Sequence, residues 1–290
     1  MNRLSLGSAQ FGMAYGVSNR EGQVLFAGVE QILFLAKKQE IDILDTAIKY
    51  GNAEEVLGKV GVGGFRVVTK LPSLPKDQNN VAHWVAEQVR ESLARLGQKK
   101  LYGLLLHRPQ DLLGLNGAQL IQALADLKND GVVQKIGVSI YSPDDLDGVY
   151  KKIQIDLVQA PLNVVDRRLQ YSGWLDRLKD DGVELHTRSV FLQGLLLMER
   201  EKIPQKFSRW SNLWDRWHEH LKRSEISALE ACLAYPLSLE QVDRVIVGVE
   251  SATQFGEILL AAQGLADVFD SSFMRSTDLD LINPSNWNYL

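Results

Sequence analysis

The sequence predicts an α/β protein built as a single (β/α)8 barrel of the TIM type. Eight short apolar runs alternate along the 290-residue chain with segments of helical periodicity. Side chains that can carry chemistry stand where several of these runs end. The length suits one barrel of about 250 residues with added segments. These observations favour a closed parallel barrel whose strand ends form the functional face.

The predicted strands are about five residues long, and helices separate them, which implies βαβ units and a parallel sheet. The alternative is a doubly wound open sheet, which usually carries a glycine-rich turn after its first strand when it binds a dinucleotide. The stretch from Gly7 to Gly12 does not match that turn. The expected strands lie near Leu4–Leu6, Ile41–Leu44, Phe65–Thr69, Leu101–Leu106, Lys135–Val138, Ile155–Val158, Val183–Thr187 and Val245–Val247.

Helices are predicted between these runs by apolar residues that recur every three or four positions. The clearest case is Val81–Leu96, and Val29–Lys38 shows the same pattern. One helix is expected to begin at Ser142 as its N-cap, because a proline and two acids follow. Ser251 and Thr253 are candidates for the cap of the last barrel helix.

Two stretches fall outside the alternation: an insertion at about 199–223, after the seventh strand, and a C-terminal tail at about 267–290. Both are expected to belong to a single domain that spans residues 1–290. The insertion carries apolar residues three and four positions apart, which predicts one helix face. That face could pack onto the barrel, form a lid over the active-site mouth, or contact another subunit. Its members are Phe207, Trp210, Trp214, Trp217 and Leu221.

The composition is that of an ordinary globular protein, with 45% hydrophobic residues, a net charge of −4 and a pI near 5.8. The sequence has no cluster of basic residues, so a nucleic acid partner is not expected. The apolar runs are shorter than the roughly 20 residues of a membrane span, and no signal peptide is evident. The single cysteine, Cys232, lies in an apolar helical pattern and is expected to serve packing. We therefore expect a cytoplasmic protein that acts on a small molecule.

Four polar residues stand at the ends of predicted strands two, three and four. Asp45 and Lys70 follow the second and third runs, Tyr50 comes five residues after Asp45, and His107 follows the fourth run. Each alone has an ordinary interpretation, such as a helix cap, a solvated strand end, a loop aromatic or a rim histidine. Because strand carboxyl ends converge in a parallel barrel, their joint placement favours one catalytic group.

These residue types suit the reduction of a carbonyl by hydride. The developing alkoxide needs a proton, which Tyr50 can supply if its pKa, ordinarily ~10, moves toward neutral. The Lys70 ammonium would stabilise the phenolate, and Asp45 would keep that ammonium charged in a buried site. His107 could donate a hydrogen bond to the substrate carbonyl and orient it. No metal is needed, and the histidines at 83, 218 and 220 lack metal-ligand spacing.

The residues also match a known family: the chain resembles the aldo-keto reductases, which are NAD(P)H-dependent oxidoreductases on a (β/α)8 barrel. The stretch from Asp45 to Gly51 resembles the hallmark loop of that family, and Lys70 and His107 resemble its remaining catalytic residues. The resemblance continues through residues 137–139, 158–163 and 245–254. It implies that NADPH or NADH is the cofactor and that Tyr50 is the general acid.

The resemblance also implies the cofactor contacts. The ribose would be met by Gly7 and Ser8, with Asp45 nearby, and the nicotinamide carboxamide would be held by Ser139 and Gln159. The residues that would run past the nicotinamide and pyrophosphate are Arg188, Ser189, Phe191, Gln193 and Gly194. The adenosine end would be met by Gly248, Ser251 and Gln254.

The chain departs from the family pattern at three places. Ile140 stands where many members have asparagine, so one carboxamide hydrogen bond is expected to be missing. Arg188 stands where an aromatic ring usually stacks on the nicotinamide, and a guanidinium plane can stack similarly. The segment Gly248–Glu257 has no basic residue, whereas members that prefer NADPH usually pair its 2′-phosphate with arginine or lysine. This composition, with the negative charge of Glu250, predicts weak NADP preference or use of NADH.

Two other functions fit part of the sequence. Lys70 could form a Schiff base as the nucleophile of an aldolase on the same fold. Alternatively, the barrel could bind a nicotinamide nucleotide without catalysis and regulate a partner through the tryptophan-rich insertion.

Overall fold

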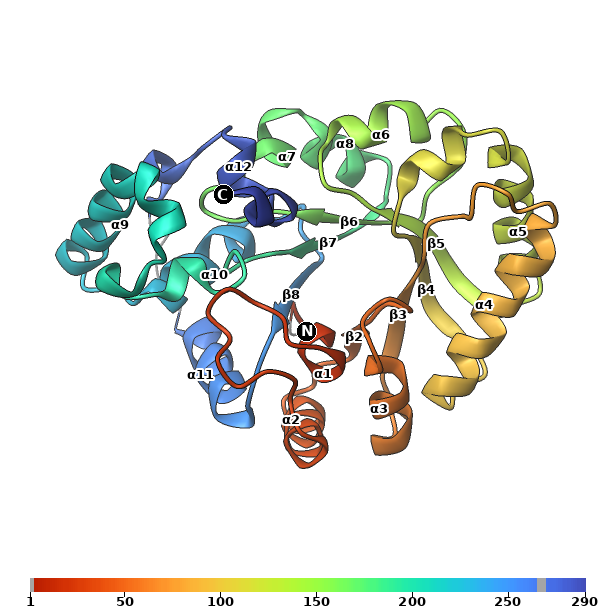
Figure 1. Cartoon of the computed structure of the whole chain (residues 1–290), viewed down its shortest axis with the longest axis horizontal. Coiled ribbons are helices and arrows are strands. Elements are labelled where there is room, and N and C mark those ends of the chain that lie inside the picture. The colour runs from red at the N-terminus through yellow and green to blue at the C-terminus, as the bar shows by residue number, and fades with distance from the viewer. Residues whose placement is uncertain (1–2, 265–269) are drawn as a thin grey trace.

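A computed structural model describes residues 3–264 and 270–290. Eight parallel strands form a closed barrel in the order of the sequence, with β8 paired to β1 (Figure 1). This confirms the predicted fold class, and every expected run contains or overlaps a strand. The strands are β1 Leu4–Gly7, β2 Ile43–Asp45, β3 Arg66–Leu71, β4 Leu101–Leu106, β5 Val133–Ser139, β6 Leu157–Pro161, β7 Glu184–Arg188 and β8 Arg244–Gly248.

Helices surround the barrel in Figure 1 and bury their apolar faces against the strands. Ser251 caps α11 as predicted, because its hydroxyl accepts the backbone N–H of Gln254, and Thr253 lies inside the helix. The helices are α1 Ala9–Gly12, α2 Phe26–Lys38, α3 Ala53–Val60, α4 Val81–Leu96, α5 Gly117–Asn129, α6 Asp144–Val149, α7 Arg168–Tyr171, α8 Trp174–Asp180, α9 Ser211–Arg223, α10 Ala228–Ser238, α11 Ala252–Gln263 and α12 Leu279–Ile282.

The start of α6 differs from the prediction. The helix begins at Asp144 with Pro143 as its N-cap, one residue later than expected. The Ser142 hydroxyl donates to Asp144 and does not cap the helix. Instead, the carboxylate of Asp145 accepts the backbone N–H groups of Ser142 and Tyr141. An acid in the first turn therefore fixes the segment that leads into the helix, and no side chain at the N-cap accepts a hydrogen bond from the first turn.

The barrel interior explains why polar residues can be held at its carboxyl end. A layer of fully buried apolar side chains fills the middle. Side chains two positions apart on a strand point to the same face, so the next residues of β2, β3 and β6 on this face are Asp45, Lys70 and Gln159. The apolar layer thus forms a floor under these polar groups. Its members are Ile43, Val68, Leu105 and Leu157.

The insertion packs its aromatic stripe internally, but the stripe does not lie on one helix. Phe207 belongs to a 3-10 helix over Gln205–Trp210, and α9 starts only after it. The indole N–H of Trp217 donates to the Leu196 carbonyl, and the Phe207 ring meets Trp287 of the tail at 4.8 Å. The stripe therefore packs on the connection after β7 and on the tail, which lies beside α9 in Figure 1. Residues 267–269 of the predicted tail lie outside the described residues.

Two further observations bear on the predictions. Cys232 is fully buried in α10, as its apolar surroundings in the sequence suggested. Within the described ranges, no helix is both long enough and apolar enough to cross a bilayer.

Candidate active site

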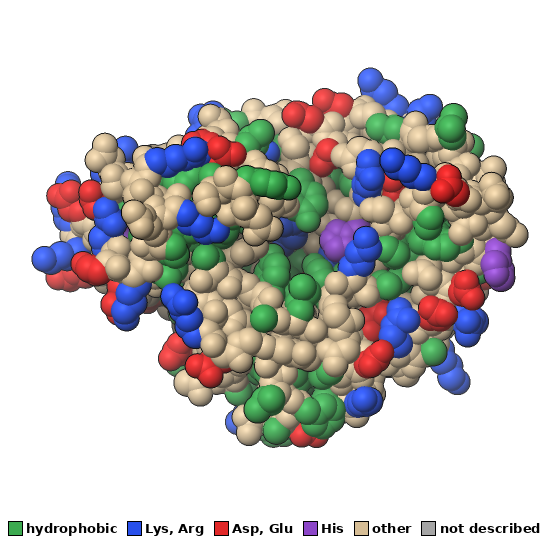
Figure 2. All heavy atoms as spheres, viewed as in Figure 1, with side chains coloured by type: hydrophobic (Ala, Val, Ile, Leu, Met, Phe, Trp, Pro, Cys, Tyr) green, Lys and Arg blue, Asp and Glu red, His purple; other side chains and the backbone are tan. Residues whose placement is uncertain are grey.

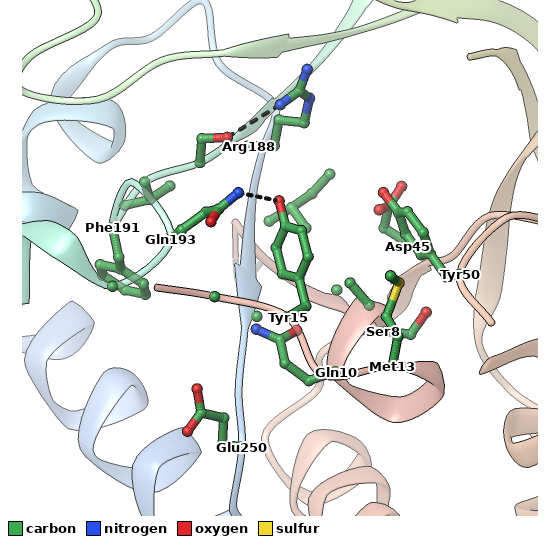
Figure 3. Close-up of a pocket in the computed structure, with 18 of the residues that line it drawn as sticks. Ser8, Gln10, Met13, Tyr15, Asp45, Tyr50, Arg188, Phe191, Gln193 and Glu250 are labelled. Atoms are coloured by element: carbon green, nitrogen blue, oxygen red, sulfur yellow. Dashed lines mark hydrogen bonds between the residues drawn. The ribbon is translucent and has the colours of Figure 1, made fainter. Parts of the chain in front are cut away.

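A cavity of about 320 Å³ opens at the carboxyl ends of the strands. Figure 2 shows the surface hollowed near the middle of this face, and Figure 3 shows side chains from several strand ends pointing into the hollow. Most of the predicted site residues line it: Gly7, Ser8, Asp45, Tyr50, His107, Ser139, Arg188, Ser189, Phe191, Gln193, Gly194, Gly248 and Gln254.

Three predicted residues do not line the cavity. Lys70 and Gln159 lie beneath it, where both bind Asp45. Ser251 is exposed, and its hydroxyl is engaged in the cap of α11. Sequence reasoning missed several lining residues on the segments that follow β1, β2 and β5, because these short segments carry no periodic signal. Among them are Gln10, Tyr15, Lys49 and Tyr141.

The centre of the site is a buried ion pair between Asp45 and Lys70. The Lys70 ammonium lies 2.7 Å from both Asp45 carboxylate oxygens and 3.0 Å from the Thr46 carbonyl oxygen. The Gln159 amide donates to the same carboxylate at 2.7 Å. Burial lowers the pKa of Lys70, while Asp45 opposes this shift and favours the ammonium. The sequence predicted that Lys70 follows its strand, whereas the structure places it within β3.

Tyr50 follows β2 in the loop before α3, and its ring lies next to both neighbouring groups of the site. The Lys70 ammonium is 4.9 Å from the ring centroid, and the His107 ring meets Tyr50 edge-on at 6.1 Å between centroids. Burial, followed by the Asp45 carboxylate, raises the pKa of Tyr50. The expected lowering of this pKa is therefore absent, because burial is the largest influence on the phenol. Tyr50 holds its proton at neutral pH.

His107 follows β4 directly, on the side of the cavity facing Tyr50. Burial lowers its pKa from 6.5 to about 4, with further contributions from the positive charges of Lys70 and Arg188. At neutral pH the imidazole is therefore uncharged. It can donate one hydrogen bond through a ring N–H, as a carbonyl-orienting group requires.

This gives a pH prediction. We expect the His107 imidazole to titrate with a midpoint near pH 4 in the folded protein, well below the ordinary 6.5. Because the folded-state pKa is depressed, the stability that this group contributes is present above pH 6.5 and is lost as the pH falls toward 4. NMR titration of the imidazole carbons, assigned with His107→Gln, measures the midpoint. A midpoint near 6.5 would contradict the described environment.

The glycine wall of the cavity is formed along β1 and β8 by Gly7 and Gly248. A Cβ at Gly248 would meet the Gln10 amide at 2.8 Å, and one at Gly7 would meet Ile246 at 3.1 Å, so glycine backbone is required for this close packing. Among the described residues the buried Ser8 hydroxyl finds no hydrogen-bond partner, and it lines the cavity. Glycine backbone and an unpaired hydroxyl fit a long ligand rich in hydroxyl and phosphate groups, such as a dinucleotide.

The loop after β7 borders the cavity in an unusual conformation. Ser189, Leu192 and Gln193 have φ of 62°, 47° and 55°, which side chains rarely adopt. The Gln193 carbonyl accepts the N–H of Val17, and its amide donates to the Tyr15 hydroxyl (Figure 3). Such strain persists where surrounding contacts hold it, and it is common at ligand-binding sites.

The described residues contain no group of three or more His, Cys, Asp or Glu side chains that could hold a metal ion.

Comparison with known proteins identifies the family. A model of the aldo/keto reductase family matches residues 3–275. The uncharacterized oxidoreductase YqkF of Bacillus subtilis (strain 168) is 25% identical over 245 residues, which cover 77% of this chain and 78% of that protein. The aldo-keto reductase YhdN of the same strain is 27% identical over 172 residues, which cover 56% and 51%.

Solved structures share the fold. The aldo-keto reductase AKR11C1 from Bacillus halodurans, in its holo form, superposes with a TM-score of 0.72 at 20% identity and covers 93% of this chain and 94% of its own. The glycerol dehydrogenase AKR11B4 from Gluconobacter oxydans gives 0.68 at 18% identity and covers 96% and 94%. Since the family model spans nearly the whole sequence, this protein is an oxidoreductase that belongs to the aldo/keto reductase family.

Proposed function

We propose that the protein reduces an aldehyde or ketone to an alcohol, with Tyr50 as the proton donor. The observation that carries this proposal is the convergence of four groups at the cavity. A protonated Tyr50 lies beside the buried Asp45–Lys70 pair, and an uncharged His107 faces its ring.

The roles follow from the atoms that face each other. When bound, a dihydronicotinamide supplies hydride to the carbonyl carbon. Tyr50 gives its phenolic proton to the carbonyl oxygen, so that the alcohol forms without a free alkoxide. Lys70 stabilises the resulting phenolate, and Asp45 retains the proton of the fully buried Lys70. His107 donates a hydrogen bond to the same oxygen and orients the carbonyl.

The cofactor contacts are proposed along the glycine wall. Ser8, with its unpaired hydroxyl, and Gly7 are assigned to the ribose, and Ser139 to the carboxamide. Gln159 already holds Asp45, so its contribution is to fix that carboxylate. The loop after β7 is assigned to the pyrophosphate, and Gly248 and Gln254 to the adenosine end. The exposed Ser251 contributes to the adenosine end indirectly, because its hydroxyl caps the helix α11 that begins there.

NADH is the proposed cofactor. Among the described residues, the basic side chains that line the cavity are Lys49 and Arg188, and Arg188 lies at the opposite end from Glu250 in Figure 3. Burial, and then the charge of Glu21, raises the pKa of Glu250, and the segment Gly248–Glu257 contains no lysine or arginine to pair with a 2′-phosphate. We expect NADH to bind at least about 10-fold more tightly than NADPH, since a charged hydrogen bond is worth about 1.5–3 kcal/mol.

Titration of intrinsic fluorescence with each cofactor, followed by cofactor oxidation with a panel of aldehydes and ketones, tests function and cofactor together. Glu250→Arg is the matched variant, and it is expected to shift binding toward NADPH. Tighter binding of NADPH to the unmodified protein would refute the NADH assignment. Binding without oxidation by any carbonyl would refute the reductase assignment and favour a regulatory nucleotide-binding protein.

A further inference from the structure

Arg188 ends β7 and lines the cavity, at the upper edge of the view in Figure 3. Its plane stacks on the Tyr141 ring, 4.6 Å from the centroid. One guanidinium nitrogen donates to the Ile140 carbonyl oxygen at 3.0 Å and another to the Ser189 hydroxyl at 3.2 Å. A guanidinium has five N–H donors, so part of its donor set stays available on the cavity side.

In residues 3–264 and 270–290, no aspartate or glutamate oxygen lies within 4 Å of the Arg188 guanidinium. Other arginines at the mouth differ, since Arg168 binds Asp166 at 2.8 Å and Arg108 lies 3.7 Å from Asp111. A half-buried guanidinium that is held by hydrogen bonds and lacks an acidic partner among the described residues can bind an anion favourably.

The charge acts on the reacting groups. The Arg188 guanidinium lowers the pKa of His107 after burial and Lys70, and it also works against the burial-driven rise of the pKa of Tyr50. Arg188, Tyr50 and His107 also line the same cavity, so one small molecule in it can contact all three. The remaining basic lining residue, Lys49, is exposed to solvent, where an ion pair contributes little.

The space beside Arg188 leads outward. Tyr141, the ring against the guanidinium, and His107 both also line a second cavity of about 690 Å³. A substrate whose carbonyl lies at Tyr50 can thus extend past Arg188 toward solvent. A polar or charged substituent there would stay hydrated on one side and meet the guanidinium on the other.

We propose that Arg188 binds an anionic group of the carbonyl substrate, so that the physiological substrates are aldehydes or ketones bearing a carboxylate or a phosphate. This inference rests on the proposed reductase function. It assigns to Arg188 a specificity role in place of the stacking on nicotinamide that the family resemblance implies.

The test compares matched anionic and neutral aldehydes. Succinic semialdehyde is paired with its methyl ester, and glyceraldehyde 3-phosphate with glyceraldehyde, so the two pairs distinguish carboxylate from phosphate. The measured quantity is the ratio of kcat/KM between the members of a pair. In Arg188→Gln this ratio is expected to fall about 30-fold for the preferred anion, mainly through KM, in keeping with a charged hydrogen bond. Arg188→Lys is expected to retain part of the preference.

Lys49→Gln is the matched control, because it removes the other cation of the cavity wall. Its ratio is expected to change less than about threefold, as for an exposed charge. Cofactor dissociation constants are measured for each variant by fluorescence. An unchanged ratio in Arg188→Gln with weakened NADH binding would assign Arg188 to the cofactor and overturn the inference. If the unmodified protein reduced the neutral and the anionic aldehydes equally well, the role of Arg188 would be refuted and the reductase function would stand. If it reduced none of the aldehydes, the proposed function would be refuted as well.

Discussion

Replacement of Tyr50 by phenylalanine is expected to lower kcat for carbonyl reduction by about 10³-fold, within the range of general acid catalysis. Phenylalanine keeps the ring that Lys70 and His107 contact, but it removes the proton that the alkoxide needs. Burial raises the pKa of Tyr50, so the lost group is the protonated phenol over the whole neutral range.

Single-turnover reduction at saturating NADH measures this effect without interference from product release. Tyr15→Phe is the matched control, because Tyr15 also lines the cavity and its hydroxyl contacts Gln193 instead of the reacting groups. The control is expected to lose less than about 10-fold. If Tyr50→Phe retained a rate within about 10-fold of the unmodified enzyme, the proton would have to come from another group.

Replacement of Lys70 by methionine is expected to lower the free energy of unfolding by about 3–5 kcal/mol, because it leaves a buried carboxylate without its counter-charge. Lys70 is fully buried, and Asp45 is only 4% exposed. In the double variant Asp45→Asn and Lys70→Met, both charges are gone and the Gln159 amide can still donate to the asparagine oxygen. Most of the lost stability is therefore expected to return.

Urea unfolding of the two single variants and the double variant measures this coupling, and reductase assays measure the catalytic role of the pair. The double variant should be stable but inactive, which separates catalysis from folding. Single losses that simply add in the double variant would show that Asp45 and Lys70 do not stabilise each other.

The barrel could be predicted because its evidence is local. Each apolar run is a strand whose length and neighbours can be read from a few residues, and the alternation with helices repeats along the whole chain. The placement of Asp45, Tyr50 and His107 at the cavity follows from the same logic, since all strand carboxyl ends meet at one face.

The finer features of the site depend on contacts between distant segments. Gln159 donates to Asp45 across 114 residues, and no local pattern encodes that register. The pKa of Tyr50 was predicted in the wrong direction, because burial, followed by the Asp45 carboxylate, raises it. Tyr141, which holds Arg188 by stacking, lies in a loop after β5 and carries no signal in the sequence.

The surroundings of Lys70 also bear on the aldolase alternative. A Schiff-base lysine has to be uncharged and accessible, whereas the Lys70 ammonium is fully buried and bound by three oxygens. We therefore expect borohydride with a carbonyl substrate to leave Lys70 unmodified, in agreement with a supporting role for this residue.

The most direct test of the account is the fate of the cofactor hydrogen. NADH carrying deuterium at both C4 positions is incubated with the enzyme and succinic semialdehyde or glyceraldehyde, and the alcohol is analysed by mass spectrometry. Hydride transfer predicts one deuterium, bound to the former carbonyl carbon, in every molecule of product. An alcohol without deuterium, or oxidation of the cofactor without alcohol, would contradict hydride transfer to the carbonyl.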